Sequence, residues 1–466
     1  MSGKISLTTD KSGKLIQNID NAIRIFENDA DLKGVFAFHE RANLIYKVKD
    51  APWDDEKNSK PRSITDTDLD KIYHYFENYG FMNQKKIESA LRIVADKNKF
   101  EPLRDYFLSR EGKYDGQPRV DRYFIDMLEA PDTPYIREAT RLFFVSIVAR
   151  TFYPGIKYDY CPILTGGQGI GKSKCCEAIL PSADYFSNDL PTTALRDSRK
   201  FLESTQGKSI IEIAELTTFR KSELEEVKQC ITTQVDRGRL AWGKVVQEVP
   251  RRFVFIGTTN QVEFLRDATG NRRFLPIKCN RKAETVNPLL FSNDFEGYRD
   301  QLWSEAVQIF REYEKNGLHL ILSKEVQDEV KIAQGEALEV DDWSELIDRY
   351  IYTQLMPSKI KGKKDSDQVS IDLSTLFIYK IVLEGETRNI DRPTSLRIGN
   401  YFLKNSDLWQ KVSTVRLGDY RGRGYRLSGS VAYFKELIAK YETDDRGFRL
   451  LSDAKCESFE QQTFAT

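Results

Sequence analysis

The sequence has few of the residues that build metal centres or disulfide frameworks. Its 466 residues include six cysteines and three histidines, and no two cysteines form a C-x-x-C pair. The histidines also lie far apart in the sequence. We therefore expect neither a zinc site nor a disulfide framework. We expect the adjacent Cys175 and Cys176 to be buried free thiols, as is usual for cysteine in such proteins.

Long apolar runs and an excess of one charge are also missing. No run of eighteen apolar residues is present, and the first residues lack the pattern of a secretory signal, so we expect a cytoplasmic protein with no membrane partner. Lys and Arg number 71 and Asp and Glu number 71, which gives a net charge of zero. A nucleic-acid site must therefore be a local patch. The length suffices for roughly two to four domains.

The most informative stretch is a glycine-rich segment with the spacing G-x-x-x-x-G-K-S, from Gly166 to Ser173. It follows the short apolar run Ile163-Leu164 and precedes a helix-compatible run. In a P-loop the backbone N–H groups surround nucleotide phosphates, Lys172 reaches the β- and γ-phosphates, and Ser173 ligates Mg²⁺. A glycine-rich turn that matches by chance is the alternative, and the flanking segments argue against it. We predict that ATP and Mg²⁺ bind at Gly166, Gly167, Gln168, Gly169, Ile170, Gly171, Lys172, Ser173 and Lys174.

Two later apolar runs end in polar residues. The run from Lys208 to Leu216 carries Glu212 and Glu215, which is typical of a buried parallel strand that brings a carboxylate to Mg²⁺ and the attacking water. Glu215 is the better candidate for orienting the water, and Glu212 could support the metal or face a cationic partner. The run from Arg251 ends at Asn260, which fits a sensor of the γ-phosphate.

The residues around the second run offer further candidates. Residues 236–249 alternate around a Gly-Lys turn and predict a hairpin with Lys244 near its tip. Residues 222–233 predict a helix opened by a capping box at Ser222. Beyond Asn260, Arg272 and Arg273 lie on a Gly-Asn turn, where an arginine finger would be placed. Surface arginines without that role are the alternative.

The order of these parts resembles the superfamily 3 helicase ATPases of viruses and plasmids. Several short sequence segments resemble more closely the virulence-associated protein E (VirE) family, whose members are encoded by prophages and pathogenicity islands. These segments are Pro154–Lys157, Gly167–Ser173, Glu212–Glu215, Thr258–Asn260 and Thr269–Phe274. The resemblance extends from about residue 100 to about residue 276, and more loosely to both ends.

The resemblance implies roles for individual residues. It assigns Lys172 and Ser173 to Walker A, Glu215 to Walker B and Asn260 to the sensor. It also makes Arg272 or Arg273 the finger that acts on a neighbouring subunit, and Lys244 the hairpin residue that faces DNA in a central channel. Family members commonly show D-x-x-R-x-x-Y before the hairpin, where this chain has Asp236, Arg239 and Trp242. Since Ala214 precedes Glu215 where many relatives have two adjacent acids, the choice between Glu212 and Glu215 as the Mg²⁺ ligand stays open.

The predicted fold is an α/β P-loop NTPase core with a mostly helical N-terminal region and a small winged-helix-like C-terminal domain. In the N-terminal part we expect helices over 15–27, 65–79 and 83–98 and a strand over 35–38. A helix-turn-helix reader of DNA at 65–98 is a weaker alternative to two helices packed on each other. The expected divisions are 1–60 (α+β), 61–130 (helical), 131–320 (ATPase core), 321–366 (helical and charged linker), 367–430 (winged-helix-like) and 431–466 (helix and tail).

The C-terminal third of this neutral chain holds a basic segment that could bind nucleic acid. Between Arg388 and Leu427 there are nine Lys or Arg and three Asp or Glu, a net charge of +6. We expect helices over 370–383 and 392–405 and a hairpin over 409–427. Phosphate contacts are predicted for Arg397, Lys404, Arg421 and Arg423, with Tyr420 and Tyr425 for base stacking. A small domain that only packs or recruits a partner is the alternative.

Together these features predict an ATP-dependent DNA helicase or translocase that acts in replication initiation of a phage or other mobile element. The finger requires a neighbour, so we expect a homo-oligomer and predict a hexamer. Single-stranded or forked DNA is the expected partner, and a separate primase or host replication proteins could cooperate. A DNA-bound ATP switch without unwinding activity is the main rival. Two other functions are disfavoured. The hairpin would have no role in a small-molecule kinase, and a GTPase would need an N-K-x-D motif after the P-loop, which the sequence lacks.

Overall fold

A computed structural model describes residues 5–55, 60–215, 221–239, 245–265, 271–338, 342–386, 390–417 and 420–443. The chain forms two compact units. Of the described residues, unit 1 comprises those from 5 to 264 and from 271 to 337, and unit 2 comprises Leu265 and those from 338 to 443. No helix in the described ranges combines the length and apolar character that crossing a bilayer requires.

The N-terminal part of unit 1 is a four-stranded sheet covered by helices. The strand order is β3-β2-β1-β4, with β4 parallel to β1 and the other pairs antiparallel. Apolar residues at helical spacing on α1, α2 and α3 form its core with β1. Thr65 closes a capping box on α2 and Asn83 caps α3, which confirms both predicted helix starts. The elements are α1 Ile19–Asn28, β1 Phe36–His39, β2 Leu44–Lys47, β3 Arg62–Ser63, α2 Asp66–Glu77, α3 Gln84–Lys97 and β4 Lys99–Phe100.

The core of this layer crosses the division expected at residue 60. Buried side chains from Ala22 to Val94 form one cluster. Residues from Leu103 to Leu128 instead join the core of the larger α/β layer. The reason is that α2 and α3 bury their apolar faces against α1 and β1, so residues on both sides of position 60 share one interior.

His39 is a buried histidine at the end of β1. Its side chain lies against Tyr46 and Phe100, and its Nδ1 accepts a hydrogen bond from the Ala42 N–H group. Burial lowers the His39 pKa from 6.5 to about 4, nearby Arg41 lowers it further, and Glu101 opposes the shift.

We predict that His39 makes unit 1 acid-sensitive. The unfolded chain takes up a proton on this ring below about pH 6.5 and the folded chain only near pH 4, so the free energy of unfolding falls by about 3 kcal/mol between these values. Urea unfolding at pH 7 and pH 4.5 measures this loss. His39→Gln should reduce the difference in the free energy of unfolding between the two pH values. His74→Gln changes a histidine whose side chain is 84% exposed, and it should leave this difference as in the wild type. An unchanged difference in His39→Gln would contradict the assignment.

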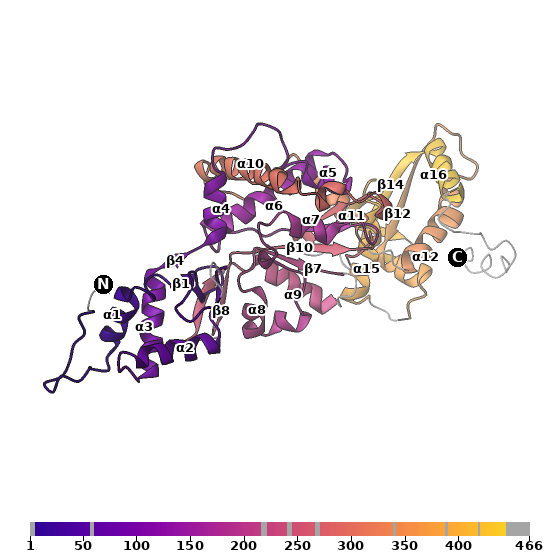
Figure 1. Cartoon of the computed structure of the whole chain (residues 1–466). Helices are drawn as coiled ribbons and strands as arrows, with labels where there is room; N and C mark the ends of the chain where they lie inside the picture. The colour runs from indigo at the N-terminus through magenta and orange to yellow at the C-terminus, as the bar shows by residue number, and fades with distance from the viewer. Residues whose placement is uncertain are drawn as a thin grey trace. The chain divides into compact units, whose positions relative to one another are not determined.

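The larger layer of unit 1 is a five-stranded parallel sheet with the order β11-β5-β10-β7-β6. Helix α6 packs on β5 and β10, and α10 packs on α6. Figure 1 shows α6 and α10 above β10, with α8 and α9 below it. In a parallel sheet the carboxyl ends of all strands meet at one edge, so the residues that follow β5, β7 and β10 lie together.

The elements of this layer are α4 Pro102–Arg110, α5 Tyr123–Leu128, α6 Pro134–Phe152, β5 Cys161–Thr165, α7 Lys172–Ala178, η1 Ala183–Tyr185, β6 Phe186–Ser187, η2 Thr192–Arg196, α8 Ser198–Thr205, β7 Ile210–Ile213, α9 Lys221–Thr232, β8 Val235–Gly238, β9 Gln247–Pro250, β10 Val254–Thr259, η4 Asn271–Arg273, β11 Phe274–Lys278, η5 Ala283–Thr285, η6 Pro288–Phe291, α10 Phe295–Lys315 and α11 Gln327–Glu336. Helix α9 begins at Lys221, so Ser222 lies inside the helix and the predicted capping box is wrong. Strands β8 and β9 pair antiparallel, which confirms the hairpin, while its predicted tip at Lys244 lies outside the described residues.

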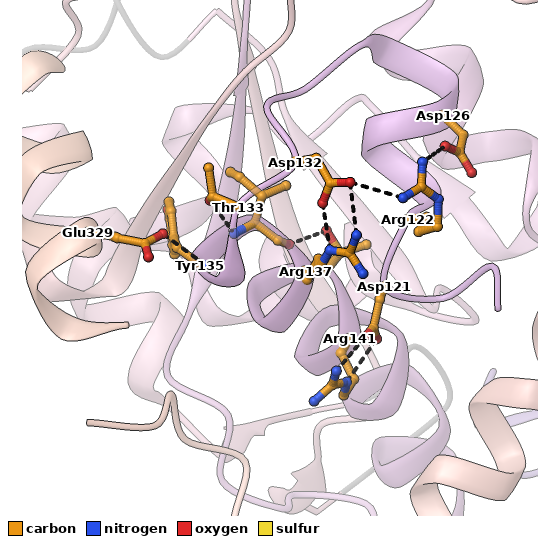
Figure 2. A network of polar contacts seen from close by, with 11 residues as sticks. Asp121, Arg122, Asp126, Asp132, Thr133, Tyr135, Arg137, Arg141 and Glu329 are labelled. Carbon is orange, nitrogen blue, oxygen red and sulfur yellow. Dashed lines mark hydrogen bonds and ion pairs between the residues drawn. The ribbon is translucent and has the colours of Figure 1, made fainter. Parts of the chain in front are cut away.

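A chain of surface ion pairs holds α5 to the start of α6 (Figure 2). Arg122 contacts Asp126 and Asp132, and Arg137 contacts Asp132 from the next turn of α6. Thr133 caps α6 through the Ile136 N–H group. Each of these ion pairs is about a third exposed or more, so each one alone contributes little to stability. Together they fix α5, whose Tyr123 hydroxyl donates to the carbonyl of Cys175 on α7.

Unit 2 is a three-stranded antiparallel sheet with helices packed on it. Its strand order is β12-β14-β13, and its elements follow one another as helix, strand, helix, helix, strand, strand and helix. The predicted helix over 370–383 is wrong in its first part, where Val369, Ile371 and Leu373 alternate with more exposed residues and form β12. The elements are α12 Asp342–Tyr350, η7 Ile351–Leu355, α13 Met356–Ile360, β12 Gln368–Ser374, α14 Thr375–Phe377, η8 Ile378–Val382, α15 Arg392–Lys404, β13 Gln410–Leu417, β14 Tyr420–Ser430 and α16 Val431–Thr443.

The segment expected to be a linker, 321–366, divides between the two units. Leu322 and Val330 belong to the core of unit 1. Ile347, Ile351 and Met356 belong to the core of unit 2. The apolar residues that anchor this segment recur only about once per helical turn, and charged residues lie between them. The segment therefore has the composition of a linker although its apolar residues are buried.

Candidate nucleotide site

The glycine-rich loop lies at the carboxyl end of β5, between β5 and α7. The loop is held to its neighbours by hydrogen bonds from the Gly166 N–H group to the Thr259 carbonyl and from the Cys279 N–H group to the Thr165 carbonyl. Gly166 has φ of 149°, and a Cβ atom there would lie 2.5 Å from the Cys279 carbonyl oxygen. Gly171, at the start of α7, has φ of 91°. Both positions therefore require glycine, as the spacing of the motif predicts.

Lys172 turns its ammonium group back over the loop. Its Nζ donates to the carbonyl oxygens of Gly166 and Gly167, both at 2.7 Å, and to Oδ1 of Asn260 at 3.0 Å. The residue is 8% exposed. Burial lowers the Lys172 pKa, and the nearby Cys279 and Glu212 oppose that shift. The structure thus brings together Lys172, at the start of α7, and Asn260, directly after β10.

Glu212 is a buried carboxylate on β7 and is 1% exposed. Its Oε1 accepts hydrogen bonds from the hydroxyl groups of Ser173, at 2.7 Å, and Thr258, at 2.5 Å. Its Oε2 is buried and has no hydrogen-bond partner among the residues that the structure describes. A buried charged oxygen without a partner costs free energy, so such an atom marks a position where a ligand or an ion fits.

A cavity of about 390 Å³ opens over the loop. Its walls come from the glycine-rich loop, the start of α7 and the ends of β7 and β10, with one residue from the segment after β6. The lining residues are Gln168, Gly169, Ile170, Gly171, Lys172, Ser173, Lys174, Asn188, Glu212, Ala214, Glu215, Thr258, Thr259 and Asn260. The predicted residues Gly166 and Gly167 contribute the carbonyl oxygens that hold Lys172.

Glu215 lies beyond the end of β7, on the exposed rim of the cavity. Its φ of 50° is in the left-handed region, which non-glycine residues adopt rarely and mostly where surrounding structure enforces it. Glu212, three residues earlier, is the carboxylate that contacts Ser173. The two acids therefore occupy different positions: Glu212 beside the hydroxyl at the start of α7, and Glu215 at the solvent edge.

The remaining candidates lie apart from the cavity. Arg272 and Arg273 form η4 just before β11, with Arg272 exposed and Arg273 partly buried, and neither is among the described residues that line the cavity. Asp236, from the predicted D-x-x-R pattern, forms a two-point ion pair with the buried Arg251. Asp236 therefore stabilises the base of the β8–β9 hairpin.

In unit 2 the predicted DNA contacts differ in their surroundings. Arg423 is exposed on β14. The Arg397 guanidinium lies 3.8 Å from the centre of the Trp343 ring, and Tyr425 stacks on Phe402 at 3.8 Å. The side chains of Lys404 and Arg421 lie outside the described part of the structure.

Four residues that line the cavity were not among the predicted site residues: Asn188, Ala214, Thr258 and Thr259. Thr258 lies two residues before Asn260, and in a strand this spacing puts both side chains on one face, which is a signal that the sequence does contain. Asn188 follows β6, a two-residue edge strand that has no apolar run to mark it. Nothing in the sequence around Asn188 distinguishes it from loop asparagines that line no cavity.

The parallel sheet, with a glycine-rich loop after β5 and polar residues at the same strand edge, places unit 1 in the class of α/β proteins with a P-loop architecture. A family model described as "Virulence-associated protein E-like domain" matches residues 108–339. The chain therefore carries a domain of the virulence-associated protein E-like family, which confirms the resemblance seen in its motifs. No match was found among curated proteins.

Several solved structures are similar over most of their length but at low identity. The apo structure of the NrS-1 C-terminal region is 14% identical, covers 84% of this chain and 95% of its own, and has a TM-score of 0.40. A structure described as "SCCmec type IV Cch - active helicase" is 10% identical, covers 87% and 99%, and has a TM-score of 0.34. An inhibitor-bound JCV helicase is 13% identical, covers 58% and 83%, and has a TM-score of 0.27. All of these TM-scores are low, so the function proposed below depends on the residues of this chain.

Proposed function

We propose that this protein is an ATPase that uses ATP hydrolysis to move along or open DNA during replication of a mobile genetic element. The observation that carries the proposal is the convergence of Lys172, Ser173, Glu212 and Asn260 on one cavity over the glycine-rich loop. These are the parts needed to bind nucleotide phosphates and to stabilise the charge that develops in phosphoryl transfer. The virulence-associated protein E-like domain supports the connection to mobile elements.

The residues around Glu212 fit a divalent cation. Carboxylate and hydroxyl oxygens are the ligands that Mg²⁺ prefers. Glu212 Oε2 is buried and has no partner within the described ranges, and the Ser173 hydroxyl lies beside the same carboxylate. We assign the support of Mg²⁺ to Ser173 and Glu212, and the orientation of the attacking water to Glu215 on the rim. Bound Mg²⁺ supplies charge neutralisation to the phosphates.

The chain's own residues account for the remaining steps. The backbone N–H groups of residues 167–173 hold the phosphates. Lys172 exchanges the carbonyl oxygens of Gly166 and Gly167 for phosphate oxygens, since an ammonium group binds an anion more strongly than it binds a neutral carbonyl. Asn260, which Lys172 contacts, lies where it can sense the γ-phosphate. The exposed Arg272 is available to a neighbouring subunit, and Arg273 next to it shares that role as a candidate.

DNA and further copies of the chain are the proposed partners, with a hexamer as the proposed assembly. The β8–β9 hairpin of unit 1 is the proposed DNA element, and Lys244, outside the described residues, is the proposed DNA contact. In unit 2 the element order and the strand order β12-β14-β13 support a winged-helix-like domain. Of the predicted DNA contacts in this domain, Arg423 on β14 is described and exposed. A separate primase or host replication proteins could cooperate with this protein.

One observation favours the rival function, a DNA-bound ATP switch. Helix α15 of unit 2 exposes Leu396 and Leu403, at 38% and 47%, and Arg397 packs on Trp343. These two exposed leucines lie seven positions apart, on one face of the helix, and suit contact with a protein partner, which a regulatory switch would recruit.

Strand displacement on a forked DNA substrate distinguishes the two functions. The proposal expects ATP-dependent separation of the strands by the full chain. ATP hydrolysis with DNA binding but no separated strands would replace the motor with the switch. Transfer of labelled phosphate to an acceptor other than water would instead indicate a kinase.

A further inference from the structure

Thr258 is a buried side chain of the cavity wall that neither the motif nor the proposed mechanism uses. It lies on β10, is 6% exposed, and neighbours Glu212 across the β7–β10 pair, where Ile256 lies opposite Glu212. Ile256 and Thr258 point to the same face of the sheet because alternate residues of a strand share a face. The Thr258 hydroxyl therefore reaches the Glu212 carboxylate.

The hydrogen bonds at Glu212 are arranged unevenly. Both available hydroxyl donors, Ser173 and Thr258, donate to Oε1, at 2.7 and 2.5 Å. Oε2 is buried and receives no hydrogen bond from the described part of the chain. A carboxylate that is free to rotate could share these donors between its two oxygens. Two donors from different elements, α7 and β10, instead hold the same oxygen.

The two donors are not equivalent when a cation is present. Ser173 is itself the proposed cation ligand, so its hydroxyl has to serve the metal and Glu212 at once. Thr258 lies on a central strand of the sheet, and Glu212 is the acceptor of its hydroxyl group. Thr258 is thus the donor that can hold Glu212 steady while Ser173 adjusts to the metal.

We propose that Thr258 is a positioning residue that fixes the Glu212 carboxylate through Oε1 and so keeps Oε2 available for the divalent cation bound with the nucleotide. This inference rests on the proposed function. Groups that orient a metal-supporting carboxylate usually change metal affinity or activity by about 10- to 100-fold when they are removed. Removal of the Thr258 hydroxyl should therefore weaken the affinity for the divalent cation and leave the contacts between the loop and the phosphates unchanged.

Thr258→Val tests the proposal because it removes the hydroxyl and keeps the branched shape. The readout is Mn²⁺ binding in the presence of AMP-PNP, a non-hydrolysable ATP analogue, followed by electron paramagnetic resonance on the full chain. We expect the Mn²⁺ concentration for half-saturation to rise about 10- to 100-fold. Binding of AMP-PNP in EDTA should stay at the wild-type value, and Thr258→Ser, which restores the hydroxyl, should restore Mn²⁺ binding.

Thr140→Val controls for the loss of a buried hydroxyl. Thr140 is fully buried on α6 and donates to the Ile136 carbonyl at 2.6 Å, away from the cavity. Its variant should bind Mn²⁺ as the wild type does. Wild-type Mn²⁺ binding in Thr258→Val, or a Thr258→Ser protein as defective as Thr258→Val, would overturn the role of Thr258. An equal loss of AMP-PNP binding in EDTA would overturn it too, since the defect would then be one of folding. Failure of the wild-type protein to bind AMP-PNP at all would instead overturn the proposed function, and this inference with it.

Discussion

Lys172→Ala should reduce ATP hydrolysis by at least about 100-fold, the loss typical of a positioned group that stabilises transition-state charge. The physical reason is the position of its ammonium group, which joins the loop carbonyls to Asn260 at the floor of the cavity. A methyl group in its place leaves the phosphate charge unneutralised in a partly buried site. Initial rates of phosphate release at saturating ATP measure the effect.

Lys157→Ala is the matched control for this change. Lys157 belongs to the same layer of unit 1, its side chain is 68% exposed, and its partner is Asp159 on the surface. Its removal subtracts the same charge without touching the cavity, so the rate should stay at the wild-type value. Equal rates for Lys172→Ala and the wild type would show that hydrolysis takes place elsewhere or that the preparation contains another ATPase.

Arg41→Ala should lower the free energy of unfolding of unit 1 by about 3–5 kcal/mol, the usual cost of removing one partner from a buried ion pair. Arg41 and Glu101 are both 0% exposed in their side chains and meet at 2.8 Å. Arg41 also donates to the Thr151 hydroxyl at 2.8 Å and to the Arg252 carbonyl oxygen. Its removal leaves the Glu101 carboxylate buried without its cation, and urea denaturation measures the loss.

Arg24→Ala gives the surface counterpart of this experiment. Arg24 pairs with Asp20 one turn away on α1, and the two side chains are 41% and 61% exposed. Exposed pairs of this kind contribute about 1 kcal/mol or less, so the variant should unfold near the wild-type denaturant concentration. If Arg41→Ala were no more destabilised than Arg24→Ala, the contacts of Arg41 would not join the N-terminal layer to the parallel sheet in solution.

The local parts of the candidate nucleotide site could be predicted from the sequence because their chemistry fixes their spacing. The positions of Gly166, Gly171, Lys172 and Ser173 follow from a loop whose backbone must approach phosphates closely, and the structure places them together. The strand before the loop and the run that ends at Asn260 were visible as apolar segments followed by polar residues. The parallel arrangement then brings these ends to one edge.

The division of work between Glu212 and Glu215 could not be settled from the sequence. Both acids follow apolar residues, and the end of β7 falls between them, at Ile213. Ile213 and Ala214, which lie between the two acids, are both apolar, so the sequence does not mark where the strand ends. The structure separates their positions, since Glu212 is buried and accepts a hydrogen bond from Ser173, 39 positions away, whereas Glu215 is exposed.

Long-range contacts and ambiguous periods explain the other differences. Arg41 lies in a short turn, and its partners Glu101 and Arg252 are 60 and 211 positions away, so no local pattern marks it. The first part of the predicted helix 370–383 contains Ile371 and Leu373 at an interval that suits a strand, and the following apolar residues suit a helix. The change of period at Ser374 is the signal that separates β12 from α14.

The measurement that tests the central claim most directly is the rate of ATP hydrolysis by the wild-type chain with and without single-stranded DNA, recorded together with its mass in solution. The account predicts a large oligomer whose turnover rises when DNA is added, and a Lys172→Ala protein that hydrolyses little ATP in either condition. A monomer whose turnover is indifferent to DNA and equal to that of Lys172→Ala would contradict the motor function and the nucleotide site together.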